Sequence, residues 1–143
     1  MAGYSGTPLA QKLGIKAGAR VLLMSAPSEF EATLGKLPEG AVITLRAGKA
    51  PAQVIVLFCK DLKTLEAKFD GARAALDESG GLWVAWPKKA SGVRTDLTED
   101  IIRDLALAAG LVDNKVCAID ETWSGLRVVV RVKDRTGGKK APR

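Results

Sequence analysis

Four short apolar runs stand out along the chain, and each is bounded by polar or glycine-rich segments. Unbroken apolar runs of this length are typical of strands that a sheet buries on both faces. The expected strands lie at residues 20–25, 41–45, 53–58 and 82–86. Helical patterns separate several of them, and this alternation predicts right-handed βαβ units and a parallel sheet with helices on both faces.

The longest expected helix follows Asp61, which can cap its first turn. Its apolar residues recur at spacings of three and four, and charged residues occupy the other side, so one face is expected to pack on the sheet. The residues of that face are Leu62, Leu65, Phe69, Ala72 and Leu76. Gly80-Gly81 is expected to end this helix.

Two further helices have recognisable start signals. Ser28 is followed three residues later by Glu31, and this spacing predicts a capping box at the start of a short helix. Another helix is expected over residues 97–109, with Asp96 or Thr98 as its cap.

The last part of the chain differs from the rest because two strand-like runs follow each other directly. Runs 115–120 and 126–132 flank the polar turn Glu121–Gly125, which predicts an antiparallel hairpin. We therefore predict an α/β fold, a Rossmann-like three-layer sandwich. Its mostly parallel six-stranded sheet has the order 2-1-3-4-6-5 and ends in this hairpin. Residues 1–132 form the single expected domain, and residues 133–143 a basic disordered tail.

This strand order, with its terminal hairpin, resembles a shortened class I methyltransferase. Such enzymes follow strand 1 with a glycine-rich turn and place an acidic residue after strand 2. Here the corresponding segments are Ser25-Ala26-Pro27-Ser28 and Arg46-Ala47-Gly48. Glu29 and Glu31 also stand where a helix N-terminus would otherwise hold a phosphate. These departures from the family predict that no cofactor is bound.

Two longer phrases of the sequence are similar to a family of small bacterial proteins of unknown function. They are YSGTPLAQKLGIKAGARV at residues 4–21 and GLVDNKVCAIDETWSGLRVVVR at residues 110–131. This resemblance implies no particular activity.

Charge and composition narrow the function classes. Of the net charge of +6, residues 133–143 contribute +4, so the rest of the chain is nearly neutral and no specific nucleic-acid partner is expected. The chain has no histidine, which excludes Ser-His-Asp and Cys-His catalysis and histidine metal sites. No metal is expected. No apolar run approaches the ~18 residues of a membrane helix, and the N-terminal residues lack a signal-peptide profile, so a cytoplasmic location is expected.

A ligand site in an open α/β sheet lies beyond the carboxyl ends of the strands, at the switch point in strand order. Here that point is expected between strands 1 and 3, lined by Ser25-Ala26-Pro27 and Cys59-Lys60-Asp61. The candidate residues on this rim are Cys59, Lys88, Lys89, Arg94, Asp120, Glu121 and Trp123. They indicate a pocket for a flat or anionic small molecule, with Trp86 or Trp123 stacking and the cations pairing.

The rim residues also have structural interpretations. Trp86 fits a buried strand position, and Lys88-Lys89 fits a solvated loop. Asp120 can bond the turn backbone while Glu121 pairs with Arg127, instead of acting as acid and base or holding a metal.

Two further residues of the rim each have a structural and a functional interpretation. Cys59 can be a buried small hydrophobe, or a thiol that Lys60 activates. Trp123, in a polar turn, has no core to fill, so packing and function stay equally open for it.

Two functions from different classes follow. The main interpretation is a non-catalytic Rossmann-like module that has lost the cofactor site and acts through a protein partner, self-association or a small ligand. The alternative is a methyltransferase-like or other small-molecule enzyme that uses the rim at the carboxyl ends of the strands.

Overall fold

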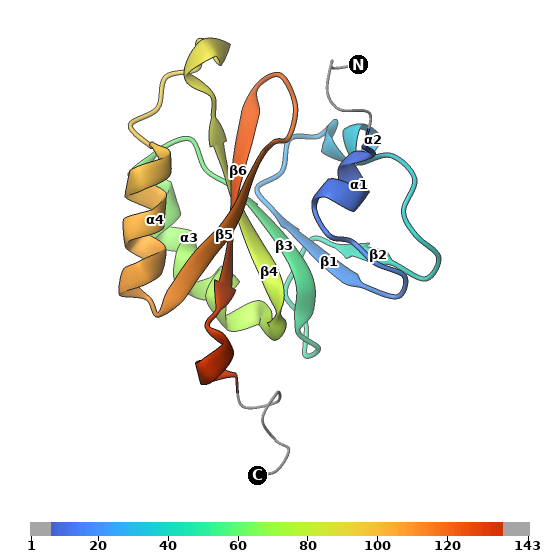
Figure 1. Cartoon of the computed structure of the whole chain (residues 1–143). Coiled ribbons are helices and arrows are strands. Elements are labelled where there is room, and N and C mark those ends of the chain that lie inside the picture. The colour runs from blue at the N-terminus through green and yellow to red at the C-terminus, as the bar shows by residue number, and fades with distance from the viewer. Residues whose placement is uncertain (1–6, 136–143) are drawn as a thin grey trace.

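The computed structural model describes residues 7–135, and its strands form one sheet in the order β2-β1-β3-β4-β6-β5 (Figure 1). The pairs among β2, β1, β3 and β4 are parallel, and β6 pairs antiparallel with both β4 and β5. The predicted strand order and terminal hairpin are confirmed. The strands are β1 (Arg20–Met24), β2 (Val42–Thr44), β3 (Ala52–Phe58), β4 (Leu76–Pro87), β5 (Leu111–Ala118) and β6 (Trp123–Val130).

Helices cover both faces of this sheet, which confirms the three-layer architecture (Figure 1). The helices are α1 (Leu9–Lys12), α2 (Phe30–Leu34), α3 (Leu62–Ala75) and α4 (Glu99–Ala108), and short 3-10 turns lie at Lys89–Ser91 (η1) and Val132–Asp134 (η2). On one face, α3 and α4 pack over Ile55, Val84 and Trp86. On the other, α1 and α2 pack over alternate strand residues such as Val56 and Trp83.

Gly80 and Gly81 do not end the long helix, so this prediction is wrong. The helix ends at Ala75, and β4 begins at the next residue and runs through both glycines. A Cβ at Gly80 would lie 2.4 Å from the carbonyl oxygen of Gln53, and one at Gly81 would lie 2.2 Å from Nε of Arg127. Gly80 is therefore needed because the backbone of Gln53 approaches it closely, and a side chain at Gly81 would require the Arg127 side chain to move. In the sequence, such glycines look the same as a helix stop signal.

Of the caps predicted for α2 and α4, the first is wrong and the second is confirmed. The capping box of Ser28 and Glu31 is wrong, because α2 begins at Phe30 and the hydroxyl of Ser28 donates to Glu29 Oε1 at 3.2 Å. Thr98 caps α4 as predicted, with its hydroxyl accepting from the backbone N–H of Ile101 at 3.2 Å. Ser28 lies one position too early to do the same for α2.

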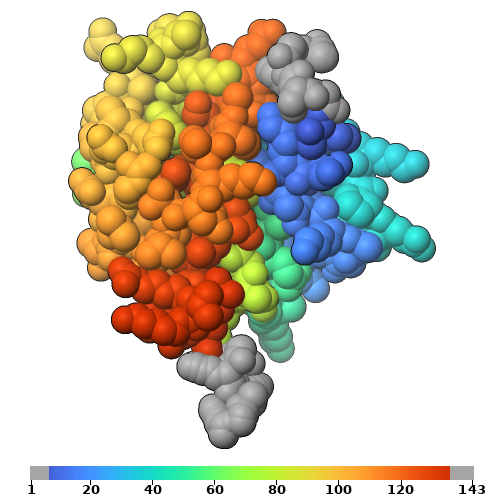
Figure 2. Space-filling view, in the orientation of Figure 1, coloured from blue at the N-terminus to red at the C-terminus, as the bar shows by residue number. Residues whose placement is uncertain are grey.

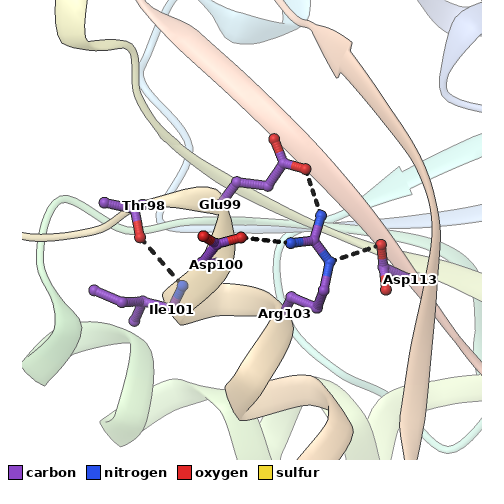
Figure 3. Close-up of polar contacts among 6 residues, drawn as sticks. All are labelled: Thr98, Glu99, Asp100, Ile101, Arg103 and Asp113. Atoms are coloured by element: carbon purple, nitrogen blue, oxygen red, sulfur yellow. Dashed lines mark hydrogen bonds and ion pairs between the residues drawn. The ribbon is translucent and has the colours of Figure 1, made fainter.

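Arg103 joins α4 to the edge strand β5 (Figure 3). Its Nε donates to Asp113 of β5 at 3.0 Å and its Nη1 to Asp100 at 2.7 Å, and its Nη2 pairs with Glu99. These bonds raise the pKa of Arg103, with Asp113 the largest cause. The contacts hold the start of α4, and the loop that leads into it, at a defined place beside the sheet.

The first helix is held against the hairpin by polar contacts on the other face. Lys12 Nζ donates to the carbonyl of Ala118 at 3.1 Å, and the blue α1 segment lies beside the orange hairpin in the space-filling view (Figure 2). The indole Nε1 of Trp83, at the centre of the sheet, donates to the carbonyl of Leu13 at 3.0 Å.

The end of the expected domain falls close to the end of the described chain. Arg135, which the sequence assigns to the tail, donates from Nε to the carbonyl of Val130 at 2.9 Å. The predicted disorder of residues 136–143 lies outside the described residues. Within residues 7–135, none of the helices has the length and apolar character needed to span a membrane.

Candidate functional site

The carboxyl ends of β1, β3 and β4 meet the turn of the β5–β6 hairpin at one edge of the sheet, the upper edge in Figure 1. A pocket of about 530 Å³ opens there. Ser25 and Pro27 line it from the end of β1, and Lys60 and Asp61 line it from the end of β3. The pocket therefore lies at the switch point that the strand order predicts.

Three aromatic rings form a row beneath this pocket. Phe58 contacts Trp123 edge-on, with ring centroids 5.0 Å apart at 89°, and contacts Phe30 at 4.9 Å and 70°. Phe58 and Trp123 both line the pocket. The row gives the pocket a rigid apolar floor.

Trp123 is placed differently from the prediction. It is the first residue of β6 and is only 7% exposed, so it belongs to the core and not to a polar turn. Asp120 explains the difference, because its Oδ1 accepts from the backbone N–H groups of Thr122 and Trp123, each at 2.8 Å. These bonds close the turn early and return the tryptophan to the sheet, where it both packs and lines the pocket.

The backbone at Ser25 has an unusual conformation. Ser25 has a φ of 60°, the only positive φ of a non-glycine residue within the described chain. Left-handed backbone is costly for residues with a side chain and clusters at functional sites. The turn after β1 thus keeps a conformation usually supplied by glycine, although the sequence lacks the glycine-rich signature.

Most of the charged side chains that line this pocket are acidic. Glu29 and Asp61 line the pocket with a single lysine, Lys60. An adjoining hollow of about 280 Å³ shares Ser25 and Pro27 and adds Glu31. Asp61 caps α3 by accepting from the N–H of Thr64 at 2.8 Å, and hydrogen bonding by Thr64 lowers its pKa, so the carboxylate stays charged.

The predicted basic residues lie on the neighbouring loop. Lys89 and Arg94 line a second pocket of about 660 Å³ with Trp86, and Val93 lines both pockets. The backbone N–H of Lys88 donates to the carbonyl of Thr122 at 2.7 Å, which joins this loop to the hairpin turn. In Figure 2 the yellow loop and the orange turn lie side by side at the upper edge. The structure therefore divides the candidate residues. Trp123 lines the first pocket, Lys89 and Arg94 line the second, and neither pocket is lined by Cys59, Lys88, Asp120 or Glu121.

Glu121 and Arg127 do not form the predicted pair. Glu121 is exposed on the turn, whereas Arg127 lies along β6, where its Nη1 donates to Asn114 at 3.4 Å. Asp120 bonds the turn backbone, as its structural interpretation predicts.

The reactive-thiol hypothesis for Cys59 is wrong. Its side chain is 1% exposed, and burial raises its pKa to about 12, with the charge of Asp61 adding to the shift. A thiolate is the reactive form of cysteine, so Cys59 acts as a small buried hydrophobe. No group of three or more histidine, cysteine or acidic side chains in residues 7–135 is arranged to hold a metal ion.

Phe58, Thr64 and Val93 line the pocket and were missed from the sequence. Phe58 lies on the same face of β3 as Val54 and Val56, so the alternation of side chains along the strand could have placed it beneath the pocket. Thr64 lies three residues after the Asp61 cap, and this too could have been read from the sequence. Val93 is in an irregular loop and has no such signal.

Solved structures share this architecture. A SAM-dependent methyltransferase from Aquifex aeolicus superposes with a TM-score of 0.59 and 12% identity, covering 86% of this chain and 88% of that one. This chain therefore has a fold similar to that of this S-adenosylmethionine (SAM)-dependent methyltransferase. The DhpI–SAH complex gives a TM-score of 0.57 at 10% identity, covering 87% and 83%. Magnesium protoporphyrin IX methyltransferase from Synechocystis PCC 6803 with bound SAM gives 0.53 at 8%, covering 86% and 74%.

No family model and no curated protein matches the chain. The structural likeness contradicts the main interpretation of the sequence, a non-catalytic module, and favours the alternative, a methyltransferase-like enzyme. The sequence lacks the glycine signature after β1, but Ser25 keeps a left-handed backbone at that turn. At these identities the likeness concerns the fold.

Proposed function

We propose that the chain is a small SAM-dependent methyltransferase that binds its methyl donor in the pocket beside Ser25. The observation that carries this proposal is the position of an acidic, aromatic-floored pocket at the switch point of a methyltransferase fold. Its volume of about 530 Å³ is that of a small-molecule site. When bound, SAM supplies an electrophilic methyl group, and the residues of this chain bind and orient it.

The charge of this pocket and its adjoining hollow fits SAM better than it fits a phosphate-bearing cofactor. SAM carries a sulfonium and an ammonium group against one carboxylate, so it is a net cation. Glu29, Glu31 and Asp61 attract such a ligand and repel a nucleotide phosphate. Carboxylates that count against a dinucleotide therefore support this donor.

The apolar floor supports the same ligand. Aromatic rings attract cations that lie over their faces, and a sulfonium has no hydrogen to donate to a carboxylate. Trp123 and Phe58 supply ring surface in the pocket. We assign them to the sulfonium and thioether part of the donor.

Two features replace the family's signature residues. The left-handed turn at Ser25 provides the backbone bend. No acidic residue follows β2, and the residue at that position, Leu45, is 66% exposed. Glu31 of α2 lines the hollow of about 280 Å³ together with Leu45 and Ser28. We assign to Glu31 the acceptance of hydrogen bonds from the donor's ribose hydroxyls.

Calorimetric titration of the whole chain tests this proposal. We expect SAM and S-adenosylhomocysteine (SAH) to bind. ATP and NAD are expected to bind at least about tenfold more weakly, which corresponds to about 1.4 kcal/mol of binding free energy. Glu29→Lys is expected to weaken SAM more than SAH, because only SAM has the sulfonium charge. Glu66→Lys, on the exposed side of α3, is the matched control and is expected to leave both unchanged.

Failure of the wild-type protein to bind SAM and SAH would refute the proposal. Equal binding of ATP and SAM would also refute it, because the carboxylates of the pocket would then have no role in selection. A cytoplasmic location, expected from the sequence, is part of the same proposal and would be checked by cell fractionation.

A further inference from the structure

The pocket next to the proposed donor site has walls of a different chemistry. Its volume is about 660 Å³, and it lies between the end of β4 and the start of α4. Trp86, Pro87 and Leu97 provide its apolar lining. Because Val93 lines this pocket and the donor pocket, a molecule in one lies next to a molecule in the other.

The carboxylates that line this second pocket are already engaged. Asp96 accepts from the backbone N–H of Leu62 through Oδ1 at 2.8 Å, which ties the loop to the start of α3. Glu99 pairs with Arg103 in the cluster of Figure 3. Both carboxylates therefore take part in contacts that hold the loop and the start of α4.

The cations of the pocket have no such partners. Lys89 and Arg94 are exposed, and neither forms an ion pair with a carboxylate of residues 7–135. The pocket is lined by two cations and two carboxylates, and only the two cations lack a partner within residues 7–135. An acidic group of a ligand can therefore pair with Lys89 and Arg94 without displacing a contact of the chain.

Trp86 adds a preference for shape. It is only 8% exposed and its side chain packs in the core formed with α3 and α4, so the part that lines the pocket is held rigidly. A fixed indole surface beside Pro87 and Leu97 favours a flat apolar body. Lys89 and Arg94 can then pair with an acidic group on the edge of that flat ligand.

We propose that this second pocket is the acceptor subsite, and that it takes a small aromatic acid whose carboxylate pairs with Lys89 and Arg94. This inference rests on the proposed function, since the acceptor is defined by its place beside the methyl donor. It concerns a ligand class that the fold does not specify.

The test is a titration of the full chain followed by amide NMR, with 2-naphthoate as the probe and neutral 2-naphthamide as its uncharged equivalent. We expect 2-naphthoate to shift the amide signals of Gly92, Val93 and Leu97. It is expected to bind about tenfold more tightly than the amide, the size of a charge-assisted contact.

Variants separate charge from shape. Lys89→Gln combined with Arg94→Gln is expected to lower the affinity for 2-naphthoate about tenfold and to leave that for 2-naphthamide unchanged. Lys36→Gln, an exposed lysine that lines neither pocket, is the matched control and is expected to change neither. All three side chains are exposed, and the amide spectrum itself reports whether each variant is folded.

Equal affinity for the acid and the amide would overturn the inference, as would shifts confined to the residues around Ser25 and Lys60. SAH, titrated into the same proteins, keeps the two proposals apart. SAH binding that survives in the double variant, with 2-naphthoate binding lost, supports both. If the wild type binds SAH but not 2-naphthoate, this inference alone falls, and if it binds 2-naphthoate with the expected selectivity but not SAH, the proposed function falls.

Discussion

Replacing Trp83 with phenylalanine tests how the first helix is held on the sheet. Trp83 is fully buried, and its Nε1 donates to the carbonyl of Leu13 at 3.0 Å. That carbonyl lies just past the end of α1, where helix carbonyls lack intrahelical partners. Phenylalanine keeps an aromatic ring in the core but has no N–H to donate.

The expected loss of stability has two parts. Leaving the Leu13 carbonyl buried without its donor costs about 1–3 kcal/mol. The smaller ring leaves a gap on the order of 40 Å³, which at roughly 24 cal/mol per Å³ costs about 1 kcal/mol. The sum, about 2–4 kcal/mol, is a large fraction of the ~5–15 kcal/mol by which such domains are stable.

Urea denaturation measures this loss. With an m-value of about 2 kcal/mol per M, the midpoint is expected to fall by about 1–2 M. Trp123→Phe is the matched control, because the Trp123 indole has no hydrogen bond within residues 7–135 and loses packing only, about 1 kcal/mol. Equal shifts for the two variants would refute the reasoning, since the hydrogen bond to Leu13 would then contribute nothing measurable.

Other predictions concern packing and ionisation. Gly80→Ala is expected to destabilise the fold by about 1–3 kcal/mol, because its Cβ would meet the Gln53 carbonyl oxygen at 2.4 Å. Gly71→Ala, in α3 with nothing within 4 Å, should instead stabilise it by about 0.5–1 kcal/mol, and a loss of stability there would contradict this account. Mass spectrometry should find Cys59 unalkylated in the folded protein at about pH 8 and alkylated in urea, since its pKa is raised to about 12. Because the unfolded thiol ionises near its ordinary value of 9.0 and the folded one near 12, stability is full below pH 9.0 and falls as pH rises toward 12. A urea midpoint that stays constant over that range, once lysine and tyrosine titration is corrected for, would contradict this assignment.

The strand order and the layers could be predicted because they depend on residue pattern. Apolar runs that are covered on both faces mark parallel strands, and the spacing of Leu65, Phe69 and Ala72 marks a helix whose buried face packs on the sheet. Handedness rules then leave few topologies to consider. The edge that carries the pockets follows from this order.

Some sequence patterns are compatible with two different local structures, and the sequence does not decide between them. Gly80 and Gly81 suit a helix stop or a crowded strand, and only the position of Gln53 and Arg127 decides for the strand. Trp123 follows polar residues and looks exposed, until the bonds to Asp120 shorten the turn. In both cases the deciding partner lies across a turn or a strand pair.

The sequence by itself therefore determined the architecture and the edge where a site lies, since these follow from local periodicity. Only the tertiary structure decided the chemistry of that edge. It showed that Ser25 keeps a left-handed turn without glycine and that burial raises the pKa of Cys59 far above neutral pH. It also showed that Asp96 and Glu99 are engaged while Lys89 and Arg94 are not. Backbone conformation, burial and pairing depend on neighbours that folding brings together, and a linear pattern does not contain them.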